Sequence, residues 1–166
     1  MADMTTSTST QTTSYRPTGY TTLTPFLCVN GAAKAIDFYT EVFGATLISK
    51  MDGPGGILVH AELQLEEGRL QVADPMEAYD LAAHAEGAPA TYSLAIYVAD
   101  CDATVKAAEA AGATVREAPS TFVTGDRFGS VLDPFGVRWS IMTRVEEVSD
   151  EEAERRVKEW MASQGQ

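Results

Sequence analysis

The sequence is poor in cysteine, in basic residues and in long apolar segments, and each shortage excludes a class of protein. Its two cysteines, Cys28 and Cys101, form no CxxC motif, so neither a disulfide framework nor a thiolate zinc site is expected. This cysteine usage fits a reducing cytoplasm, the expected location. The longest apolar runs are far too short to cross a bilayer, so no membrane partner is expected. Residues 1–14 lack the apolar core of a signal peptide and the Arg-rich pattern of a transit peptide.

Basic residues are outnumbered two to one, with 12 Lys and Arg against 24 Asp and Glu and a formal net charge of −12. Such a surface repels a phosphate backbone, so no nucleic-acid partner is expected. Six of the acidic residues crowd the segment 146–154, where they form a solvated surface. That part of the charge therefore says little about a ligand.

Aliphatic residues are nearly absent from the first 20 positions, which are rich in Thr and Ser. A segment of this kind cannot bury enough apolar surface to offset the entropy of ordering. We therefore expect residues 1–20 to be a disordered tail, with the folded domain beginning at residue 21.

From residue 21 the chain alternates between strand and helix patterns. Residues 22–29 alternate in polarity as a strand does, and an apolar stripe with helical spacing then leads to Gly44, a glycine typical of a helix C-cap. The stripe consists of Ala32, Ala35, Ile36, Tyr39 and Phe43. Three extended segments follow at 45–51, 56–64 and 69–73, with a hairpin turn at 66–68.

The same order of elements recurs in the second half. It contains a strand at 91–99, a helix at 102–111, and extended segments at 114–117, 127–132 and 137–143. The segment FGAT at 43–46 corresponds to AGAT at 111–114, and Asp133-Pro134-Phe135-Gly136 forms the last turn. The fold class predicted is α+β, a single domain over 21–145 made of two tandem βαβββ modules, 21–74 and 91–145, with a linker at 75–90. Their mixed sheets are expected to curve around a cavity.

A separate amphipathic helix is expected in residues 146–166. Ser149 and Glu152 have the spacing of a capping box, and Ala153, Val157 and Trp160 fall on one helical face with Met161. This face should pack on the domain itself or on a second subunit.

Several motifs resemble the vicinal oxygen chelate superfamily, which contains glyoxalase I, bleomycin-resistance proteins and extradiol dioxygenases. The resemblance covers residues 23–143 and is carried by NGAAKAIDFYTEVFG at 30–44, with its Phe-Tyr pair, and by the DPFG turn at 133–136. The segments VHAEL at 59–63, GDRFG at 125–129 and DPFGVRWS at 133–140 are more similar to its PhnB-like branch. The resemblance implies the fold, whereas one fold hosts many activities.

The resemblance also implies four positions for metal ligands, one on the first and one on the last strand of each module. Counted from the family motifs, they are occupied by Thr24, Gln71, Ser93 and Ser140. Members that bind a metal have His or Glu there, because imidazole and carboxylate suit divalent transition metals. Neutral hydroxyl and amide groups do not, so no metal ligand or cofactor is predicted, although a divalent metal held elsewhere is left open.

Alternation along the strands predicts which side chains line the cavity. The predicted ligand-binding residues are Thr24, Phe26, Cys28, His60, Gln71, Ser93, Tyr97, Arg138 and Ser140. This lining is suited to a small organic molecule with a polar or anionic group, since Arg138 can bind a carboxylate or phosphate. Arg127 is expected to pair with Asp126, with Asp133 or with a ligand, and Trp139 to pack under a helix.

His60 and Glu62 are the candidate catalytic residues, because they lie two positions apart on one strand face. Two hypotheses follow. In the first, the protein binds a small molecule without the usual metal. In the second, it is a lyase, isomerase or dioxygenase in which His60 and Glu62 carry acid–base chemistry or hold a metal off the usual site. A homodimer is the expected assembly, as the resemblance implies.

Overall fold

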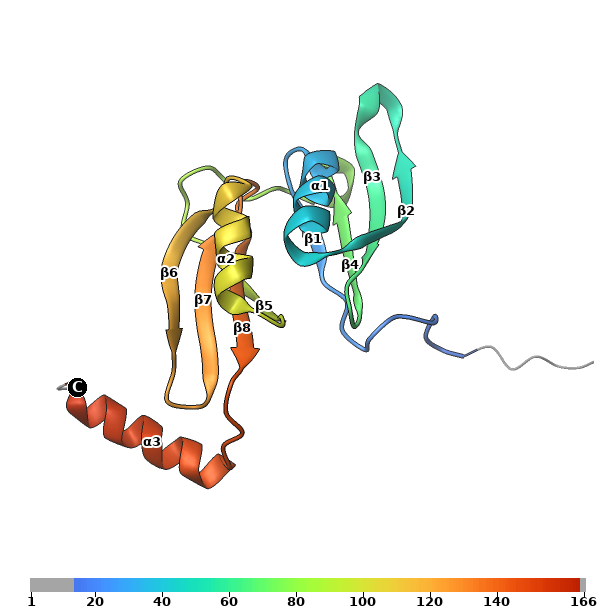
Figure 1. The fold of residues 1–166 in the computed structure, drawn as a ribbon. Helices are drawn as coiled ribbons and strands as arrows, with labels where there is room; N and C mark the ends of the chain where they lie inside the picture. The colour runs from blue at the N-terminus through green and yellow to red at the C-terminus, as the bar shows by residue number, and fades with distance from the viewer. Residues whose placement is uncertain (1–13, 165–166) are drawn as a thin grey trace, which may run out of the picture.

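The computed structural model describes residues 14–164 and shows two βαβββ modules followed by a C-terminal helix (Figure 1). The first module contains β1 (Phe26–Cys28), α1 (Ala32–Phe43), β2 (Thr46–Asp52), β3 (Leu58–Gln64) and β4 (Arg69–Ala73). The second contains β5 (Ser93–Tyr97), α2 (Cys101–Ala110), β6 (Thr114–Thr121), β7 (Asp126–Leu132) and β8 (Arg138–Arg144), and α3 (Asp150–Ser163) follows. Short 3₁₀ turns occupy Pro54–Gly56 and Glu77–Tyr79. Most of the expected N-terminal tail, residues 1–13, lies outside the described residues.

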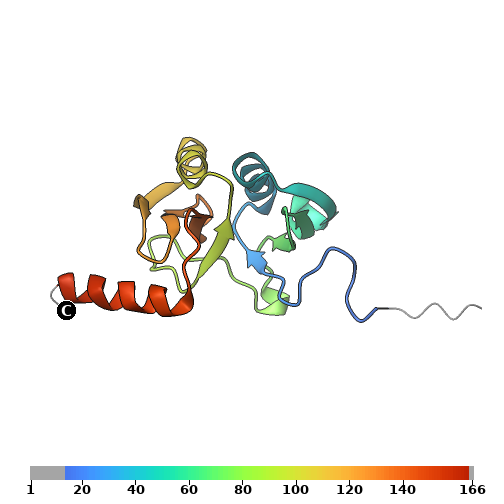
Figure 2. The same cartoon turned by 60° about the horizontal axis from the view of Figure 1, so that its bottom comes forward.

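Each module forms its own four-stranded mixed sheet, with the orders β1-β4-β3-β2 and β5-β8-β7-β6. In both, the first strand pairs in parallel with the last, and Phe26 opposite Gln71 corresponds to Ala95 opposite Ser140. Each residue of the first pair lies 69 positions before its counterpart in the second pair, so the two sheets have the same register. Figure 2 shows β1 and β5 running along the middle of the molecule with α1 and α2 on the same side of the sheets. The predicted duplication is confirmed.

Helix α1 begins and ends where its sequence pattern predicts. Ala32, Ala35, Ile36 and Tyr39 are buried, as expected from their helical spacing. The helix ends at Gly44, which has a φ of 65°, a conformation that costs glycine little. At the other end, the N-cap residue is a glycine and supplies no side chain to cap the helix.

The carboxylate of Asp74, just after β4, satisfies the backbone at the start of α1. Its Oδ1 accepts hydrogen bonds from the amides of Gly31 and Ala32 at 3.0 and 2.9 Å, and its Oδ2 accepts one from Leu58 at 2.7 Å. These amides are among those that a helix and a strand end leave without partners. Asp74 therefore joins α1, β3 and β4.

The two modules share one apolar core. The Trp139 ring of β8 lies 4.6 Å from that of Phe43 in α1, and the Phe135 ring in the β7–β8 turn lies 6.1 Å from that of Phe38. Trp139 is 2% exposed, so the expectation that it packs under a helix is confirmed. Because aromatic rings from one module fill spaces in the other, neither half has a complete core alone.

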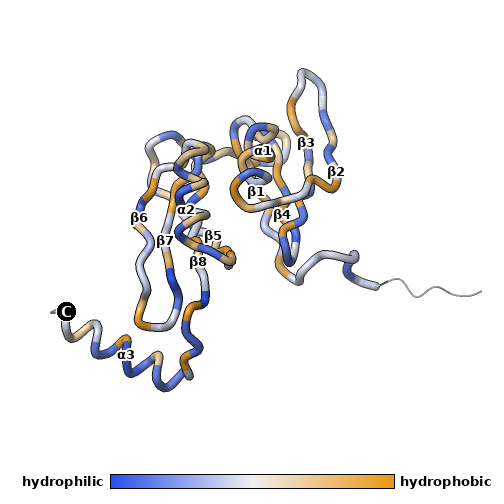
Figure 3. The backbone as a smooth tube through the Cα atoms, viewed as in Figure 1, coloured by the Kyte–Doolittle hydropathy of each residue, from blue (hydrophilic) through white to orange (hydrophobic). Residues whose placement is uncertain are grey.

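Helix α3 extends from the second module (Figure 1) and is largely hydrophilic (Figure 3). Half of the predicted capping box is present: the Ser149 hydroxyl accepts a hydrogen bond from the amide of Glu152 at 3.3 Å, whereas the Glu152 carboxylate accepts from Arg155 and Arg156. The helix contacts its own domain through Trp160, whose ring lies 5.3 Å from that of Phe122, and through Arg156, whose Nη1 donates to the Val123 carbonyl at 3.4 Å. Among the described residues, no helix has the length and apolar character needed to span a bilayer.

Two strands differ most from the prediction. The first strand spans Phe26–Cys28 instead of residues 22–29. Strand β6 continues to Thr121 instead of ending at 117, across a register shift and past Pro119. Proline is tolerated there because β6 is the edge strand of its sheet and Pro119 need not donate to a neighbour.

Candidate functional site

The predicted ligand-binding residues that are on strands lie on the sheet faces turned away from α1 and α2, whereas Thr24 lies in the segment before β1. Along β5, Leu94 and Ile96 are partly buried towards the helices, whereas Ser93, Ala95 and Tyr97 are exposed. Along β4, Leu70 and Val72 are buried, and Gln71 between them points to the other face. This open face is called the ligand face below.

In the second module, the ligand face is centred on a hydroxyl pair. The Oγ atoms of Ser93 and Ser140 are 2.9 Å apart and form a hydrogen bond. Ser93 also donates to the carbonyl of Arg138 at 3.3 Å. The two serines were predicted from separate strands, and the structure brings them together.

Arg138 is held by a residue that sequence reasoning did not find. Its Nη2 donates to Glu117 Oε2 at 2.6 Å and to Ser130 Oγ at 3.2 Å. Glu117 lies on β6, two strands away from Arg138 on β8, so no local spacing reveals the pair. Ser130 is fully buried and also donates to Glu117. Arg138 therefore keeps only part of its hydrogen-bonding capacity for a ligand.

In the first module, the ligand face carries the candidate catalytic pair. His60 Nε2 lies 3.6 Å from Glu62 Oε1, and the His60 ring lies 5.9 Å from the Phe26 ring. Phe26 is 39% exposed and offers an apolar surface beside the imidazole. The structure thus brings together His60, Glu62 and Phe26, as strand alternation predicts.

Two further residues hold Glu62, and neither was predicted. The Tyr20 hydroxyl donates to Glu62 Oε1, and Arg69 Nη1 donates to Oε2 at 2.7 Å. The Arg69 guanidinium also lies 4.9 Å from the centre of the Tyr20 ring. The hydrogen bond from Tyr20, then those from Arg69 and His60, lower the pKa of Glu62 below its ordinary value. Alternation along β4 places Arg69 on the face of Gln71, but no signal in the sequence brings Tyr20 there.

The four positions of the family's metal ligands do not fit a divalent metal here. The shared register supports the correspondence of Gln71 with Ser140 and, at the same offset, of Thr24 with Ser93. All four side chains are neutral, and no group of three or more His, Cys, Asp or Glu suited to a metal occurs in residues 14–164. The donor set therefore supplies no carboxylate or imidazole at the usual site.

Cys28 borders a pocket of about 270 Å³ that also touches Phe26, Tyr92 and Phe135. Burial first, and then the nearby Asp74 carboxylate, raise the pKa of the Cys28 thiol. A thiol with a raised pKa is a poor nucleophile at neutral pH, so Cys28 is suited to forming part of a wall.

Arg127 does not use the partners that its sequence neighbours suggest. Its Nη2 donates to Asp102 Oδ1 on α2 at 2.6 Å, so the expected pairing with Asp126 or Asp133 is wrong. The Oδ1 atom of Asp126 instead lies 3.1 Å from Arg144 Nε. The reason is topological, since α2 packs across β7 and brings a carboxylate from 25 residues away.

Comparison with known families agrees with the duplicated modules and the DPFG turn. Residues 19–141 match the family model described as the glyoxalase/bleomycin resistance protein/dioxygenase superfamily. The chain belongs to this superfamily. The predicted resemblance is therefore confirmed at the level of the superfamily.

Relatives and solved structures extend the same result. Uncharacterized proteins of Mycobacterium bovis and Mycobacterium tuberculosis are each 37% identical over 148 residues, covering 86% of this chain and 93% or 84% of theirs. The crystal structure of TioX from Micromonospora sp. ML1 is 24% identical, with a TM-score of 0.59 over 74% of this chain and 97% of that one. A PhnB protein from Bacillus cereus is 20% identical, with a TM-score of 0.59 over 74% and 99%. At these identities the two structures show a shared fold.

Proposed function

We propose that this protein binds a small organic molecule with a polar or anionic group on its ligand face, without the divalent metal used by other members of the superfamily. The observation that supports this best is the Ser93–Ser140 hydroxyl pair, 2.9 Å apart, at positions where metal-binding members have charged or imidazole ligands. Hydroxyl groups hydrogen-bond an organic ligand but bind divalent transition metals weakly.

The ligand face also suits an aromatic or otherwise apolar ligand body. Phe26 on β1 is 39% exposed and Tyr97 on β5 is 55% exposed. Exposed aromatic side chains beside a few polar groups are typical of small-molecule sites. His60 and the remaining N–H groups of Arg138 can donate to a carboxylate or phosphate. The proposed ligand therefore combines a ring with a polar or anionic group.

The alternative is that His60 and Glu62 make the protein a lyase, isomerase or dioxygenase. It is supported by the 3.6 Å approach of the two side chains. With a lowered pKa, Glu62 is ionised at neutral pH, so its role would be to orient the His60 imidazole. His60 would then carry the proton transfer.

The discriminating experiment combines metal analysis with binding. Protein treated with EDTA is titrated with 4-hydroxybenzoate and phenyl phosphate by ligand-observed NMR, and its metal content is measured by mass spectrometry. We expect binding to survive EDTA, and Phe26→Ala or Ser140→Ala to weaken it. About one equivalent of tightly held metal, lost together with binding, would contradict the proposal. Product formation that His60→Ala abolishes would favour the alternative.

We also propose a homodimer and a place in the PhnB-like branch. The ligand face exposes Phe26, Tyr97 and Met51, and a second copy would shield such apolar groups from water. The sequence similarity of VHAEL, GDRFG and DPFGVRWS to that branch supports the placement. Light scattering after gel filtration tests the dimer, and a mass near 17.8 kDa would rule it out.

A further inference from the structure

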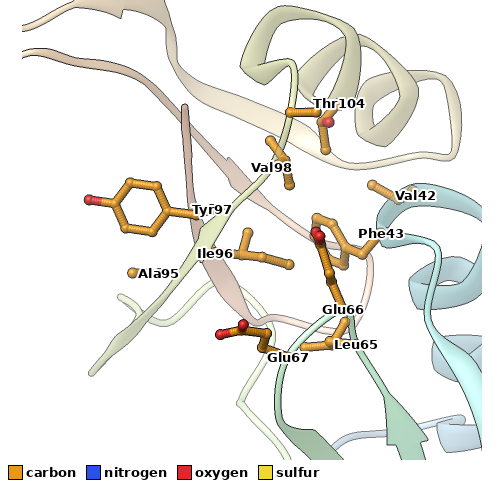
Figure 4. A pocket seen from close by; sticks show the side chains of 11 residues that line it. Val42, Phe43, Leu65, Glu66, Glu67, Ala95, Ile96, Tyr97, Val98 and Thr104 are labelled. Atoms are coloured by element: carbon orange, nitrogen blue, oxygen red, sulfur yellow. The ribbon is translucent and has the colours of Figure 1, made fainter. Parts of the chain in front are cut away.

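A second pocket lies between the modules, on the side of the sheets where the helices pack (Figure 4). It has a volume of about 600 Å³. Its apolar walls include Phe43 at the end of α1 and Ile96 and Val98 on and after β5, and its rim carries Glu66 and Glu67 from the β3–β4 turn. In Figure 4 the Tyr97 ring points away from these side chains. Ala95 and Tyr97 also border the pocket, which therefore reaches β5, but Ser93, Ser140 and His60 are not among the residues that line it.

The internal repeat allows these apolar walls to be compared with the equivalent side chains of the first module. Ile96 and Val98 correspond to Leu27 and Val29 of the first module, at the same offset of 69 residues. Leu27 and Val29 are each 1% exposed, whereas Ile96 and Val98 are only partly buried. Equivalent apolar side chains are thus covered in one module and left open in the other.

The β7–β8 turn and the β3–β4 turn, which occupy equivalent places in the two modules, also differ. The β7–β8 turn places Phe135 against Phe38 and Tyr39 of α1, with ring centres 6.1 and 6.4 Å apart. That turn closes with Asp133 N donating to Val137 O, whereas the β3–β4 turn closes with Leu65 N donating to Gly68 O. The β3–β4 turn is therefore one residue shorter, and it carries two glutamates, Glu66 and Glu67, in place of the proline and the phenylalanine ring.

The helices add to the same asymmetry. At the offset of 69, Phe38 and Tyr39 of α1 correspond to Ala107 and Ala108 of α2. Two alanines fill much less space than two aromatic rings. The cavity lies beside the turn that lacks an equivalent of Phe135, and α2 borders it through Thr104 and not through the two alanines.

The charge at the rim indicates what can enter. Neither Glu66 nor Glu67 forms an ion pair with Lys, Arg or His within residues 14–164. Arg69, the first residue of β4, pairs with Glu62 on the other side of the sheet. Two carboxylates above an aromatic and aliphatic cavity favour a positive charge and disfavour an anion. The net charge of −12 acts in the same direction.

We propose that this pocket is a second binding site, for a small organic cation whose apolar body occupies the cavity beside Phe43 and whose ammonium group lies at Glu66 and Glu67. The apolar body gains from burial against Phe43, Ile96 and Val98. The ammonium group gains from the two carboxylates and stays close to water, so it loses little hydration. The site goes beyond the proposed function, because it has another place and takes the opposite charge.

The test is an NMR titration of ¹⁵N-labelled protein with benzyltrimethylammonium chloride, compared with phenylacetate and benzyl alcohol. We expect saturable shifts of the Phe43, Ile96 and Val98 amides with the cation, weaker shifts with the alcohol and none with phenylacetate. Glu66→Gln combined with Glu67→Gln should weaken cation binding about twofold to thirtyfold, since exposed charge pairs contribute about 0.2–1 kcal/mol each. Val98→Phe, which fills the cavity, should abolish it.

The matched control is Glu147→Gln combined with Glu151→Gln, which removes the same charge from exposed positions away from the pocket. It should leave the affinity nearly unchanged. Three results would overturn the proposal: no shifts at millimolar cation, equal shifts with phenylacetate, or equal weakening by the control pair. The double substitution of Glu66 and Glu67 leaves the ligand face intact, so 4-hydroxybenzoate binding should persist. A failure of the cation-site proposal can therefore be told apart from a failure of the proposed function.

Discussion

The Tyr39 hydroxyl of the first module donates a 2.9 Å hydrogen bond to Asp133 Oδ2 of the second, across their shared core. Tyr39 is fully buried and Asp133 is 4% exposed. Asp133 also accepts from Trp139 Nε1 at 3.0 Å and from the amides of Phe135 and Val137 at 2.9 Å each. A buried carboxylate with four donors is satisfied, and it fixes the DPFG turn against α1.

Tyr39→Phe should lower the free energy of unfolding by about 1–2 kcal/mol, because it removes one donor from a buried acceptor while keeping the ring. Urea denaturation followed by circular dichroism measures the change. Tyr79→Phe is the matched control, since Tyr79 is 71% exposed and should cost almost nothing. Equal effects of the two substitutions would show that the hydrogen bond between the modules contributes little.

The ionisation of Glu62 should be linked to Tyr20. The pKa of Glu62 is lowered chiefly by the Tyr20 hydroxyl, so Tyr20→Phe should raise it towards the ordinary value. Because the folded pKa is lowered, the stability contributed by Glu62 is present above its unfolded pKa of about 4.3 and is lost as pH falls through the folded pKa. ¹³C NMR titration of the side-chain carboxyl gives the pKa directly.

The variant Glu62→Gln tests how the lowered pKa of Glu62 makes the free energy of unfolding depend on pH. The difference in unfolding free energy between the native protein and this variant should be larger at pH 7 than at pH 3. Glu147→Gln, at an exposed position, is the control and should show no such pH dependence. A Glu62 carboxyl that titrates at its ordinary value in both the native protein and the Tyr20→Phe variant would contradict the assigned role of Tyr20.

Metal donors placed at the hydroxyl pair should create metal affinity. Ser93 and Ser140 are already in hydrogen-bond contact, so Ser93→His with Ser140→Glu places an imidazole and a carboxylate on neighbouring strands. We expect the double variant to bind Ni²⁺ or Zn²⁺ measurably more tightly than the native protein in isothermal titration. The single variants should gain less, because one donor gives no chelation. An unchanged affinity would argue against the correspondence of these positions with the family's metal site.

Removing the N-cap of α3 should destabilise that helix and leave the other elements unchanged. Ser149→Ala removes the acceptor for the Glu152 amide and should destabilise α3 by about 1 kcal/mol. Hydrogen exchange should become faster in residues 150–163 and stay unchanged in α1. Ser163→Ala, at the opposite end of α3, is the control. Faster exchange throughout the domain would mean that α3 is part of the cooperative core.

The elements of the fold could be predicted because their signals are local. The stripe from Ala32 to Tyr39 and the glycine at 44 determine α1, and the DPFG turn follows from its residues. The family resemblance and the repeat relate Gln71 to Ser140, and strand alternation assigns both to the ligand face. The pairing of Gln71 with Phe26 and of Ser140 with Ala95 comes from the structure.

The partners of charged residues could not be predicted, because they come from elements distant in sequence. Glu117 reaches Arg138 across β7, and Asp102 reaches Arg127 from α2. Tyr20 reaches Glu62 from the segment before β1, where no periodic pattern indicates a contact. The second pocket was also missed, since a cavity depends on the volumes of side chains from several elements, and only the absence of an aromatic residue at 66–67 points to it.

The one-residue difference between the two turns bears on the history of the molecule. Two separate copies of one module would have identical turns and would assemble as a symmetric pair in which each turn met the same helix of its neighbour. When two such modules are joined in one chain, each of the two equivalent surfaces can change in sequence independently of the other. Phe135 packs the second module against α1 of the first. The shorter turn with Glu66 and Glu67 is not needed for this contact and can serve another role.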